Sequence, residues 1–253
     1  MQLNFDGKTI DQVAIERIQT FVPPEGYWLA FSGGKDSVVL LDLTKRSGVK
    51  FEPHYNVTGI DPPELVKFIR AYHPEVIRDM PEKSIWKCIE HKGLPTRVSR
   101  WCCEVLKERG GQGRFVLTGI RAEESSKRRN RPMVQNCVKG KGKRFLHPII
   151  DWKVTDIWQY IREFSIPYCE LYDRGYKRLG CVGCPMSTRQ KQELEAYPKI
   201  KDAWHRASDR YFEAQSKGVK QFNSADQFWN WWLGNQSVAQ VKEQEEAIDS
   251  MFT

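Results

Sequence analysis

The sequence of 253 residues contains no apolar run long enough to form a membrane-spanning helix, which takes about 18 or more residues. Its first residues, MQLNFDGKTIDQ, are polar and lack the apolar core of a secretory signal. Hydrophobic residues make up 40% of the chain and charged residues 28%, which are the proportions of an ordinary water-soluble globular protein. We therefore expect a cytoplasmic protein that does not associate with a membrane.

Two common nucleotide-binding motifs are missing around the stretch YWLAFSGGKDSVVLLDL, residues 27–43. It lacks both the four-residue spacer of the Walker loop and the third glycine of the dinucleotide fingerprint. What it contains is an apolar run, the turn SGGKDS at 32–37 and a second apolar run. Paired glycines let the backbone turn sharply and approach an anion, and the N-terminus of the next helix attracts negative charge. The turn therefore predicts a phosphate-binding loop in which Lys35 neutralises charge.

Acidic residues are absent between Ser125 and Leu146, where eight Lys or Arg occur. Such a block is suited to the phosphates of a nucleotide or of RNA. A solvated basic loop explains the same composition. The charge pattern leaves both interpretations open.

Seven cysteines occur in a chain for which we expect a reducing compartment, so disulfides are not predicted. Cys102 and Cys103 are adjacent, and Cys181 and Cys184 form the pair CVGC, a spacing typical of a metal centre. Structural zinc and an iron–sulfur cluster both fit four thiolates. Cys137 can replace one member of the adjacent pair, because neighbouring residues on a strand point to opposite faces. The remaining thiols are expected to be ordinary buried residues, Cys88 and Cys169.

Apolar runs and helical periodicity alternate along the chain, which predicts an α/β fold with a doubly wound, mostly parallel five-stranded sheet. The expected strands are 27–31, 51–57, 76–80, 114–120 and 144–150, and the expected helices are 10–21, 37–46, 62–72, 83–91, 102–109 and 154–164. Ligands bind beyond the carboxyl ends of such strands. The predicted domains are residues 1–189, with the nucleotide and metal sites, and a helical extension, 190–253. Its tryptophans either pack against the sheet domain or stack on nucleic-acid bases: Trp204, Trp229, Trp231 and Trp232.

The turn SGGKDS resembles the pyrophosphate loop (PP-loop) of the adenine-nucleotide α-hydrolase superfamily. Four further segments are similar, in the same order, to the phosphoadenylyl-sulfate (PAPS) reductase family: RWCCEVLK at 100–107, TGIRAEESSKRR at 118–129, HPIIDW at 147–152 and IPYCELYDRGYKRLGCVGCP at 166–185. The resemblance implies a Rossmann-like α/β fold that binds ATP or an adenylyl compound, such as adenylyl sulfate, at the α-phosphate.

The same resemblance implies roles for individual residues. The phosphates are held by Ser32, Gly33, Gly34, Lys35, Asp36 and Ser37. Gly119 and Arg121 close the nucleotide crevice, and Arg128 and Arg129 reach phosphates or a second substrate. The expected catalytic residues are Lys35, Asp36 and Arg121. Mg²⁺ is expected on Asp36 or on Asp151, which can equally cap the helix at 154, whereas His147 is expected to be a packed core residue.

The cysteine pattern looks like that of assimilatory adenylyl-sulfate reductases, in which a cysteine pair and a later CxxC hold a 4Fe–4S cluster. The resemblance therefore implies a cluster held by Cys102, Cys103, Cys181 and Cys184, with Cys137 as the alternative ligand. The reductases also carry a carboxy-terminal Glu-Cys-Gly motif whose cysteine attacks sulfur, but in this sequence no cysteine follows Cys184.

This difference favours an ATP-consuming enzyme of the type found among related pyrophosphate-loop proteins. Such proteins cleave ATP to AMP and pyrophosphate, adenylate an oxygen of the acceptor and replace it by sulfur. The alternatives are a sulfonucleotide reductase that uses a thiol from elsewhere, and a nucleotide-binding subunit of a larger modification or defence assembly. We also expect a nucleic-acid or small anionic acceptor, a sulfur donor protein and a homo-oligomer.

Overall fold

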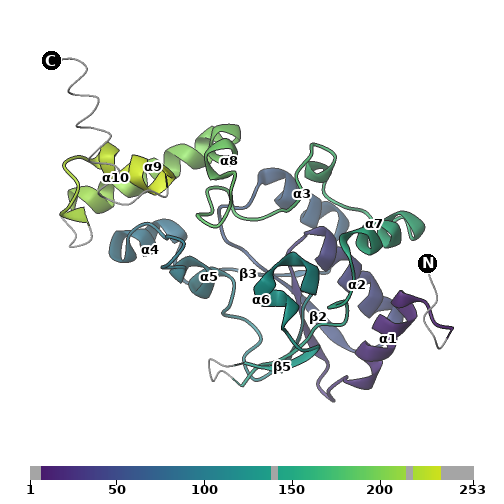
Figure 1. The fold of residues 1–253 in the computed structure, drawn as a ribbon. Helices are drawn as coiled ribbons and strands as arrows, with labels where there is room; N and C mark the ends of the chain where they lie inside the picture. The colour runs from purple at the N-terminus through teal and green to yellow at the C-terminus, as the bar shows by residue number, and fades with distance from the viewer. Residues whose placement is uncertain (1–6, 138–141, 215–218, 235–253) are drawn as a thin grey trace. The chain divides into compact units, whose positions relative to one another are not determined.

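The computed structural model describes residues 7–137, 142–214 and 219–234 of the chain (Figure 1). The chain divides into two compact units that interleave along the sequence. Unit 1 comprises Met1–Val57, Pro63–Met80 and Arg109–Leu179, and unit 2 comprises Thr58–Pro62, Pro81–Glu108 and Gly180–Thr253. The sequence predicts two continuous domains with one boundary, between residues 189 and 190, and this division remains a proposal.

Unit 1 is built on a mixed sheet with the strand order β3-β2-β1-β4-β6-β5. Its strands are β1 (Tyr27–Phe31), β2 (Phe51–Asn56), β3 (Ile77–Asp79), β4 (Phe115–Leu117), β5 (Val134–Asn136) and β6 (Arg144–Leu146). All neighbouring strands pair in parallel except β5 and β6. The chain winds outward from β1 in both directions, which confirms the predicted α/β class and the mostly parallel sheet.

Within the described residues the sheet has six strands, and the prediction of five was wrong in this detail. The additional strand is β5, which pairs antiparallel with β6 at the edge of the sheet. It comprises only three residues, VQN, inside the basic segment. Two of these residues are polar, so the local sequence carries no apolar signal for a strand. Residues 138–141 of the same basic segment lie outside the described residues.

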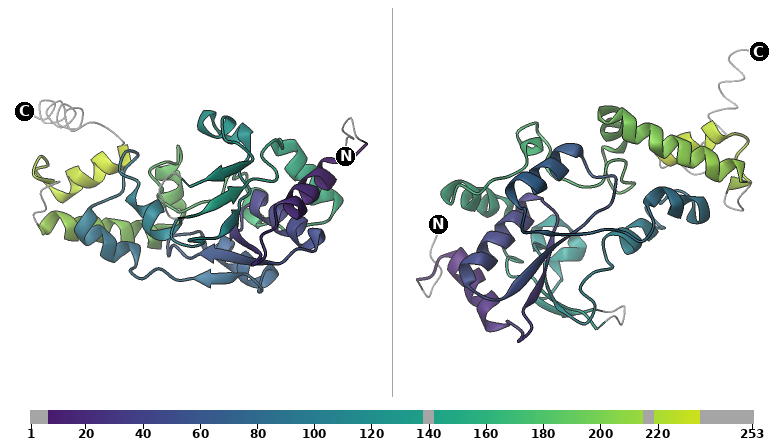
Figure 2. Two further views of the ribbon diagram at one scale, coloured as in Figure 1. Left: turned by 90° about the horizontal axis from the view of Figure 1, so that it is seen from below. Right: turned by 180° about the vertical axis from the view of Figure 1, so that it is seen from behind.

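Helices of unit 1 pack along the sheet around one hydrophobic core. They are α1 (Ile10–Thr20), α2 (Lys35–Ser47), α3 (Pro63–Tyr72) and α7 (Val154–Glu163), with the short 3₁₀ turn η2 (Glu170–Tyr172). The 3₁₀ turn η1 (Ala122–Glu124) and the short helix α6 (Ser126–Arg129) contribute no buried residue to this core. Figure 2 shows α1 and α2 side by side. The core includes Leu29 of β1, Leu40 of α2 and Leu117 of β4, each fully buried. This packing fixes the start of α2 directly after the end of β1.

Unit 2 is helical and has a second core rich in aromatic residues. Its helices are α4 (Ile85–Lys92), α5 (Trp101–Leu106), α8 (Gln190–Ala196), α9 (Pro198–Glu213) and α10 (Ala225–Gly234). Trp204, Trp229 and Trp232 are each at most 5% exposed, so these side chains form the core of unit 2 and offer no ring for base stacking. The indole N–H of Trp204 donates to the carbonyl of Val182 at 3.1 Å, which ties α9 to the CVGC segment. Within the described residues, no helix is both long and apolar enough to cross a membrane.

Candidate nucleotide site and thiol pocket

The predicted nucleotide loop lies where the strand order of the sheet reverses. Strand β1 has β2 on one side and β4 on the other, and both pairs are parallel. The carboxyl ends of β1 and β4 therefore meet at one edge, where the SGGKDS turn and the TGIR segment leave the sheet. In open α/β sheets this reversal is the place where ligands bind.

Two adjacent glycines shape the loop in different ways. Gly33 has φ +72°, and a Cβ there would lie 2.7 Å from Leu65 Cδ1 and 2.8 Å from Ile69 Cδ1, so both its backbone angle and its surroundings require glycine. Gly34 has φ −76° and is the N-cap of α2, but it supplies no side-chain hydrogen bond to the helix. The N-cap residue therefore adds no side chain that would cover the positive end of the helix.

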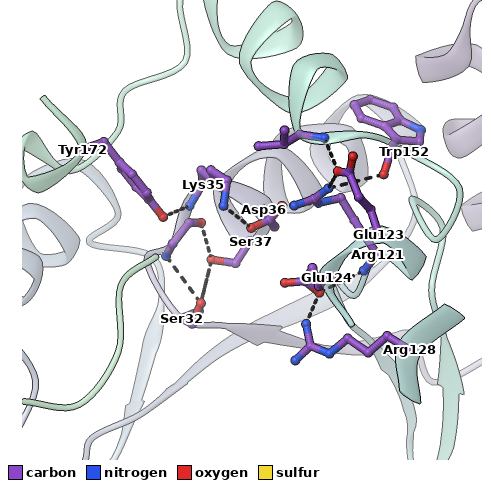
Figure 3. A network of polar contacts seen from close by, with 12 residues as sticks. Ser32, Lys35, Asp36, Ser37, Arg121, Glu123, Glu124, Arg128, Trp152 and Tyr172 are labelled. Carbon is purple, nitrogen blue, oxygen red and sulfur yellow. Dashed lines mark hydrogen bonds and ion pairs between the residues drawn. The ribbon is translucent and has the colours of Figure 1, made fainter. Parts of the chain in front are cut away.

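Hydroxyl groups of the loop close a small hydrogen-bonded ring (Figure 3). The Ser32 hydroxyl donates to Ser37 Oγ at 3.2 Å, and the Ser37 hydroxyl in turn donates to the Gly34 carbonyl at 2.8 Å. The amide of Ser32 also donates to Ser37 Oγ. These contacts fix the backbone of the turn.

Three charged side chains form a chain of ion pairs beside the loop (Figure 3). Lys35 Nζ lies 3.1 Å from Asp36 Oδ2, and Arg121 Nε lies 2.6 Å from Asp36 Oδ1. The side chains of Lys35 and Arg121 are 7% and 4% exposed, so both cations are largely removed from water. Arg121 also contacts Glu123 at 2.8 Å. The structure thus brings together the three residues predicted to be catalytic, and their catalytic role remains a prediction.

Gly119 allows the TGIR segment to approach α2. A Cβ at this position would lie 2.8 Å from the backbone oxygen of Asp36. No side chain fits in that space without a shift of backbone. The observed contact explains why a glycine precedes Arg121 by two positions: it lets the arginine reach the carboxylate of Asp36.

The short helix α6 presents further arginines from the TGIRAEESSKRR segment. Arg128 pairs with Glu124, while Arg129 is exposed. Burial, together with the charges of Arg178 and Arg131, lowers the pKa of Arg128. Burial is the largest cause of this shift, and the neighbouring cations Arg178 and Arg131 add positive potential that favours an anion.

Tyr172 of η2 also contacts the loop, although sequence reasoning did not select it. The backbone N–H of Lys35 donates a hydrogen bond of 2.9 Å to the Tyr172 hydroxyl (Figure 3). The Lys35 ammonium lies 5.6 Å from the centroid of the same ring. Burial raises the pKa of Tyr172, so the phenol keeps its proton. The only signal in the sequence was that Tyr172 belongs to the 166–185 segment that carries the family resemblance.

Asp151 and His147 of the HPIIDW segment have structural contacts. Asp151 does not cap α7, because Lys153 is the N-cap residue and Asp156 accepts the hydrogen bond from its amide at 2.7 Å. Asp151 instead forms a two-point ion pair with Arg17, at 2.7 and 2.8 Å. His147 is fully buried, and its Nδ1 lies 2.6 Å from Thr118 Oγ1, as expected for a packed core histidine.

Four of the predicted metal ligands line one pocket within unit 2. Cys102 and Cys103 lie on α5, and Cys181 and Cys184 belong to the CVGC segment; Trp204 and Leu106 form part of the apolar wall. The helical backbone of α5 allows two neighbouring thiols to face the same space, which a strand would not allow. Cys137 directly follows β5 in unit 1, and it is absent from the lining of this pocket.

Two basic side chains contact thiols of this pocket. Arg100 donates a hydrogen bond of 3.4 Å to Cys103 Sγ, and Lys107 shares a hydrogen bond with Cys181. A hydrogen bond from Cys102 and the charge of Arg100 outweigh burial and hold the pKa of Cys103 well below its usual range. Burial raises the pKa of Cys181 to about 12. In the part of the chain that the structure describes, no group of three or more His, Cys, Asp or Glu side chains is arranged to hold a metal ion.

Comparison with known proteins agrees with the fold. A profile of the phosphoadenosine phosphosulfate reductase domain matches residues 26–187, which is more than half of the chain. The chain therefore belongs to this family, and the predicted resemblance is confirmed. The match includes the SGGKDS loop, the TGIR segment and all four cysteines of the pocket.

Individual relatives support the same assignment. An adenosine 5'-phosphosulfate reductase of Neisseria meningitidis serogroup B is 33% identical over 183 residues, covering 66% of this chain and 74% of that protein. An uncharacterized protein of Methanocaldococcus jannaschii is 30% identical over 220 residues, covering 80% of this chain and 45% of that protein. The chain spans about half the length of this relative and of a second one from the same organism.

The fold is shared with a solved structure of the family. The crystal structure of phosphoadenylyl-sulfate reductase from Candida auris, in its phosphate complex, superposes with a TM-score of 0.53. The two sequences are 21% identical, and the superposition covers 72% of this chain and 97% of that one. This similarity shows a common fold.

Proposed function

We propose that the chain is an enzyme that binds ATP at the 32–37 loop, cleaves it to AMP and pyrophosphate, and adenylates an acceptor for sulfur transfer. In this reaction an oxygen of the acceptor attacks the α-phosphorus and pyrophosphate leaves. The observation that supports the proposal most strongly is the Lys35–Asp36–Arg121 ion-pair chain beside a glycine turn at the switch point of the sheet. Two largely buried cations at this edge stabilise negative charge that develops on phosphoryl oxygens.

Asp36 is best suited to a positioning role. Its two carboxylate oxygens are engaged by Lys35 and Arg121. Because the carboxylate of Asp36 is already paired with two cations, binding Mg²⁺ as a third cation would add little stabilisation. Asp36 instead orients Lys35 and Arg121. We infer that Mg²⁺ enters with the phosphates of ATP and that Asp36 holds the two cations in place.

The thiol pocket is proposed to hold a 4Fe–4S cluster on Cys102, Cys103, Cys181 and Cys184. The donor set is suitable, since four thiols and no carboxylate line the space. Four thiolates suit an iron–sulfur cluster and a single zinc ion alike, and the resemblance to adenylyl-sulfate reductases favours the cluster. Such a cluster supplies a site for sulfur binding or electron transfer. Cys137 remains the second choice as a ligand, because it is absent from the lining of the pocket.

The acceptor is proposed to be an anion, either a nucleic acid or a small molecule. Arg128, Arg129 and Arg131 supply positive charge near the crevice. A sulfur donor protein, a homo-oligomeric state and a cytoplasmic location complete the proposal and remain predictions.

The test is nucleotide turnover by protein purified without oxygen. We expect AMP formation from ATP that depends on the acceptor, and exchange of radiolabelled pyrophosphate into ATP. Lys35→Met should abolish both signals, whereas Lys45→Met, at the exposed end of α2, should retain them. Absence of AMP and of exchange with every acceptor class tested would exclude the ATP-cleaving function.

A second candidate is reductive cleavage of adenylyl sulfate, which the named activity of the Neisseria meningitidis relative favours. This reaction transfers two electrons from a thiol donor and releases sulfite and AMP. Sulfite release from adenylyl sulfate in the presence of a dithiol, without pyrophosphate exchange, would select this function. Tight ATP binding without either reaction would instead indicate a nucleotide-binding subunit.

A further inference from the structure

The amide of Lys35 stands out among the N–H groups of the loop because its partner comes from a distant segment. The Ser32 amide donates to Ser37 Oγ at 3.2 Å, and the Gly34 amide donates to Ser32 Oγ at 3.4 Å. Both partners belong to the loop itself. Lys35 donates to the Tyr172 hydroxyl at 2.9 Å, the shortest of the three bonds. This amide is also the first N–H of α2, one of the N-terminal amides that a helix offers to an anion.

We propose that Tyr172 occupies the place of a phosphoryl oxygen on the Lys35 amide, and that nucleotide binding displaces its hydroxyl. This inference rests on the proposed function, since it assumes that the loop binds a phosphoryl group. One N–H forms one strong hydrogen bond, so the phenol oxygen and a phosphoryl oxygen compete for it. Tyr172 then sets the affinity of the site by competing with the ligand.

The surroundings of Tyr172 place its oxygen directly over the loop. A Cβ built on Gly34 would lie 3.4 Å from the Tyr172 hydroxyl, so this oxygen lies against the face of the turn that an anion approaches. The aromatic ring packs edge-on against Trp158, with ring centroids 5.2 Å apart. The neighbouring residue Leu171 is 1% exposed and anchors the backbone of η2. Displacement therefore requires rotation of one side chain and no movement of the segment.

Besides the buried Leu171, exposed ion pairs contact the segment that carries Tyr172. Arg174 pairs with Glu64 of α3 and with Glu170, each at 3.1 Å, and its side chain is 52% exposed. Exposed pairs of this kind contribute little to stability. The Tyr172 hydroxyl accepts a hydrogen bond from the Lys35 amide, and a phosphoryl oxygen replaces it there.

The test compares Tyr172→Phe with the wild-type chain, using inorganic pyrophosphate and AMP as probes in equilibrium binding. Removing the competing oxygen leaves the Lys35 amide unpaired in the unliganded variant, so we expect either probe to bind roughly 2–10-fold more tightly. Tyr168→Phe is the matched control, because the Tyr168 hydroxyl donates to Asp173 at 3.0 Å in the same segment. Its affinity should stay that of the wild type. A purely structural role of Tyr172 would weaken binding when the hydroxyl is removed.

A spectroscopic measurement gives the second readout. The chain contains nine tyrosines, and after incorporation of 3-fluorotyrosine the Tyr172 signal is the one missing from the Tyr172→Phe spectrum. We expect this fluorine signal to shift on addition of pyrophosphate. Unchanged or weaker binding by Tyr172→Phe, with a wild-type chain that binds, would overturn the inference and leave the proposed function intact. Failure of both chains to bind pyrophosphate and AMP would overturn the two together.

Discussion

Arg121 and Asp36 are joined by an ion pair of 2.6 Å that links the segment after β4 to the first turn of α2. The guanidinium is 4% exposed and the carboxylate 17%. Gly119 makes the approach possible, since any side chain there would collide with the backbone of Asp36. The pair therefore fixes the relative position of the two loops that form the candidate nucleotide site.

Asp36→Asn should destabilise the fold. The substitution leaves the buried guanidinium of Arg121 without its main counter-charge, which costs about 3 kcal/mol of unfolding free energy. Asp151→Asn is the control, because it breaks the Arg17 pair, in which the carboxylate is 58% exposed, and should cost less than about 1 kcal/mol. Urea denaturation of the two variants checks this difference. Equal losses of unfolding free energy in the two variants would mean that the Asp36–Arg121 pair stabilises the fold no more than an exposed ion pair does.

Gly33→Ala should lower the stability of the fold, whereas Gly34→Ala should leave stability nearly unchanged and weaken ligand binding. Alanine at 33 meets a positive φ and the side chains of Leu65 and Ile69, so we expect a loss of about 2 kcal/mol in unfolding free energy. Alanine at 34 has an ordinary φ and no contact closer than 3.4 Å, so stability should change by less than about 1 kcal/mol.

The same Gly34→Ala variant should bind pyrophosphate at least roughly tenfold more weakly, because its methyl group occupies the face of the turn that accepts the anion. Thermal unfolding and equilibrium binding measure the two effects on one preparation. Wild-type affinity in Gly34→Ala would place the anion elsewhere.

Cysteine variants test the ligands of the proposed cluster. Cys102→Ser and Cys181→Ser should each lose most of the bound iron, because a hydroxyl is a poor ligand in place of a thiolate. Cys137→Ser and Cys88→Ser should retain it. Iron and sulfide analysis of protein purified without oxygen provides the measurement. Loss of iron in Cys137→Ser, with retention in Cys102→Ser, would make Cys137 the ligand; zinc in place of iron would exclude the cluster.

The buried His147 should make the stability of the protein depend on pH. Burial, with the charges of Arg131 and Arg128, lowers the pKa of His147 to about 4, below its usual value near 6.5. Between these two values the unfolded chain binds a proton that the folded chain does not, so this residue's contribution to stability falls as the pH falls. The slope is at most about 1.4 kcal/mol per pH unit.

His147→Gln removes this titration, so urea denaturation should show a shallower loss of stability between about pH 6.5 and pH 4 in the variant than in the wild type. Parallel curves would mean that the folded protein protonates His147 as easily as the unfolded chain does. The direction of the difference is therefore the decisive result.

Much of the nucleotide site was predictable because its residues lie in short segments with strong local signals. The run YWLAF and the SGGKDS turn define β1 and the start of α2, and the order of strands then brings TGIR to the same edge. The contact of Tyr172 with Lys35 was not predictable, since it joins positions 137 residues apart and depends on tertiary packing.

Which segments of the chain make up unit 2 was not predictable either, because this depends on tertiary packing. The cysteine spacing indicated a shared site, but it gave no sign that residues 58–62 and 81–108 pack with the helical tail. The tryptophans were ambiguous in sequence, because packing and base stacking select the same residue type. Their burial resolves this ambiguity for Trp204, Trp229 and Trp232.

The central claim is that the 32–37 loop binds the phosphates of an adenine nucleotide, and calorimetric titration of the purified chain with ATP tests it most directly. The account predicts saturable binding by the wild type, about 10–100-fold weaker binding by Lys35→Met and wild-type binding by Lys45→Met. No heat of binding in the wild type, or equal affinity in Lys35→Met, would contradict it.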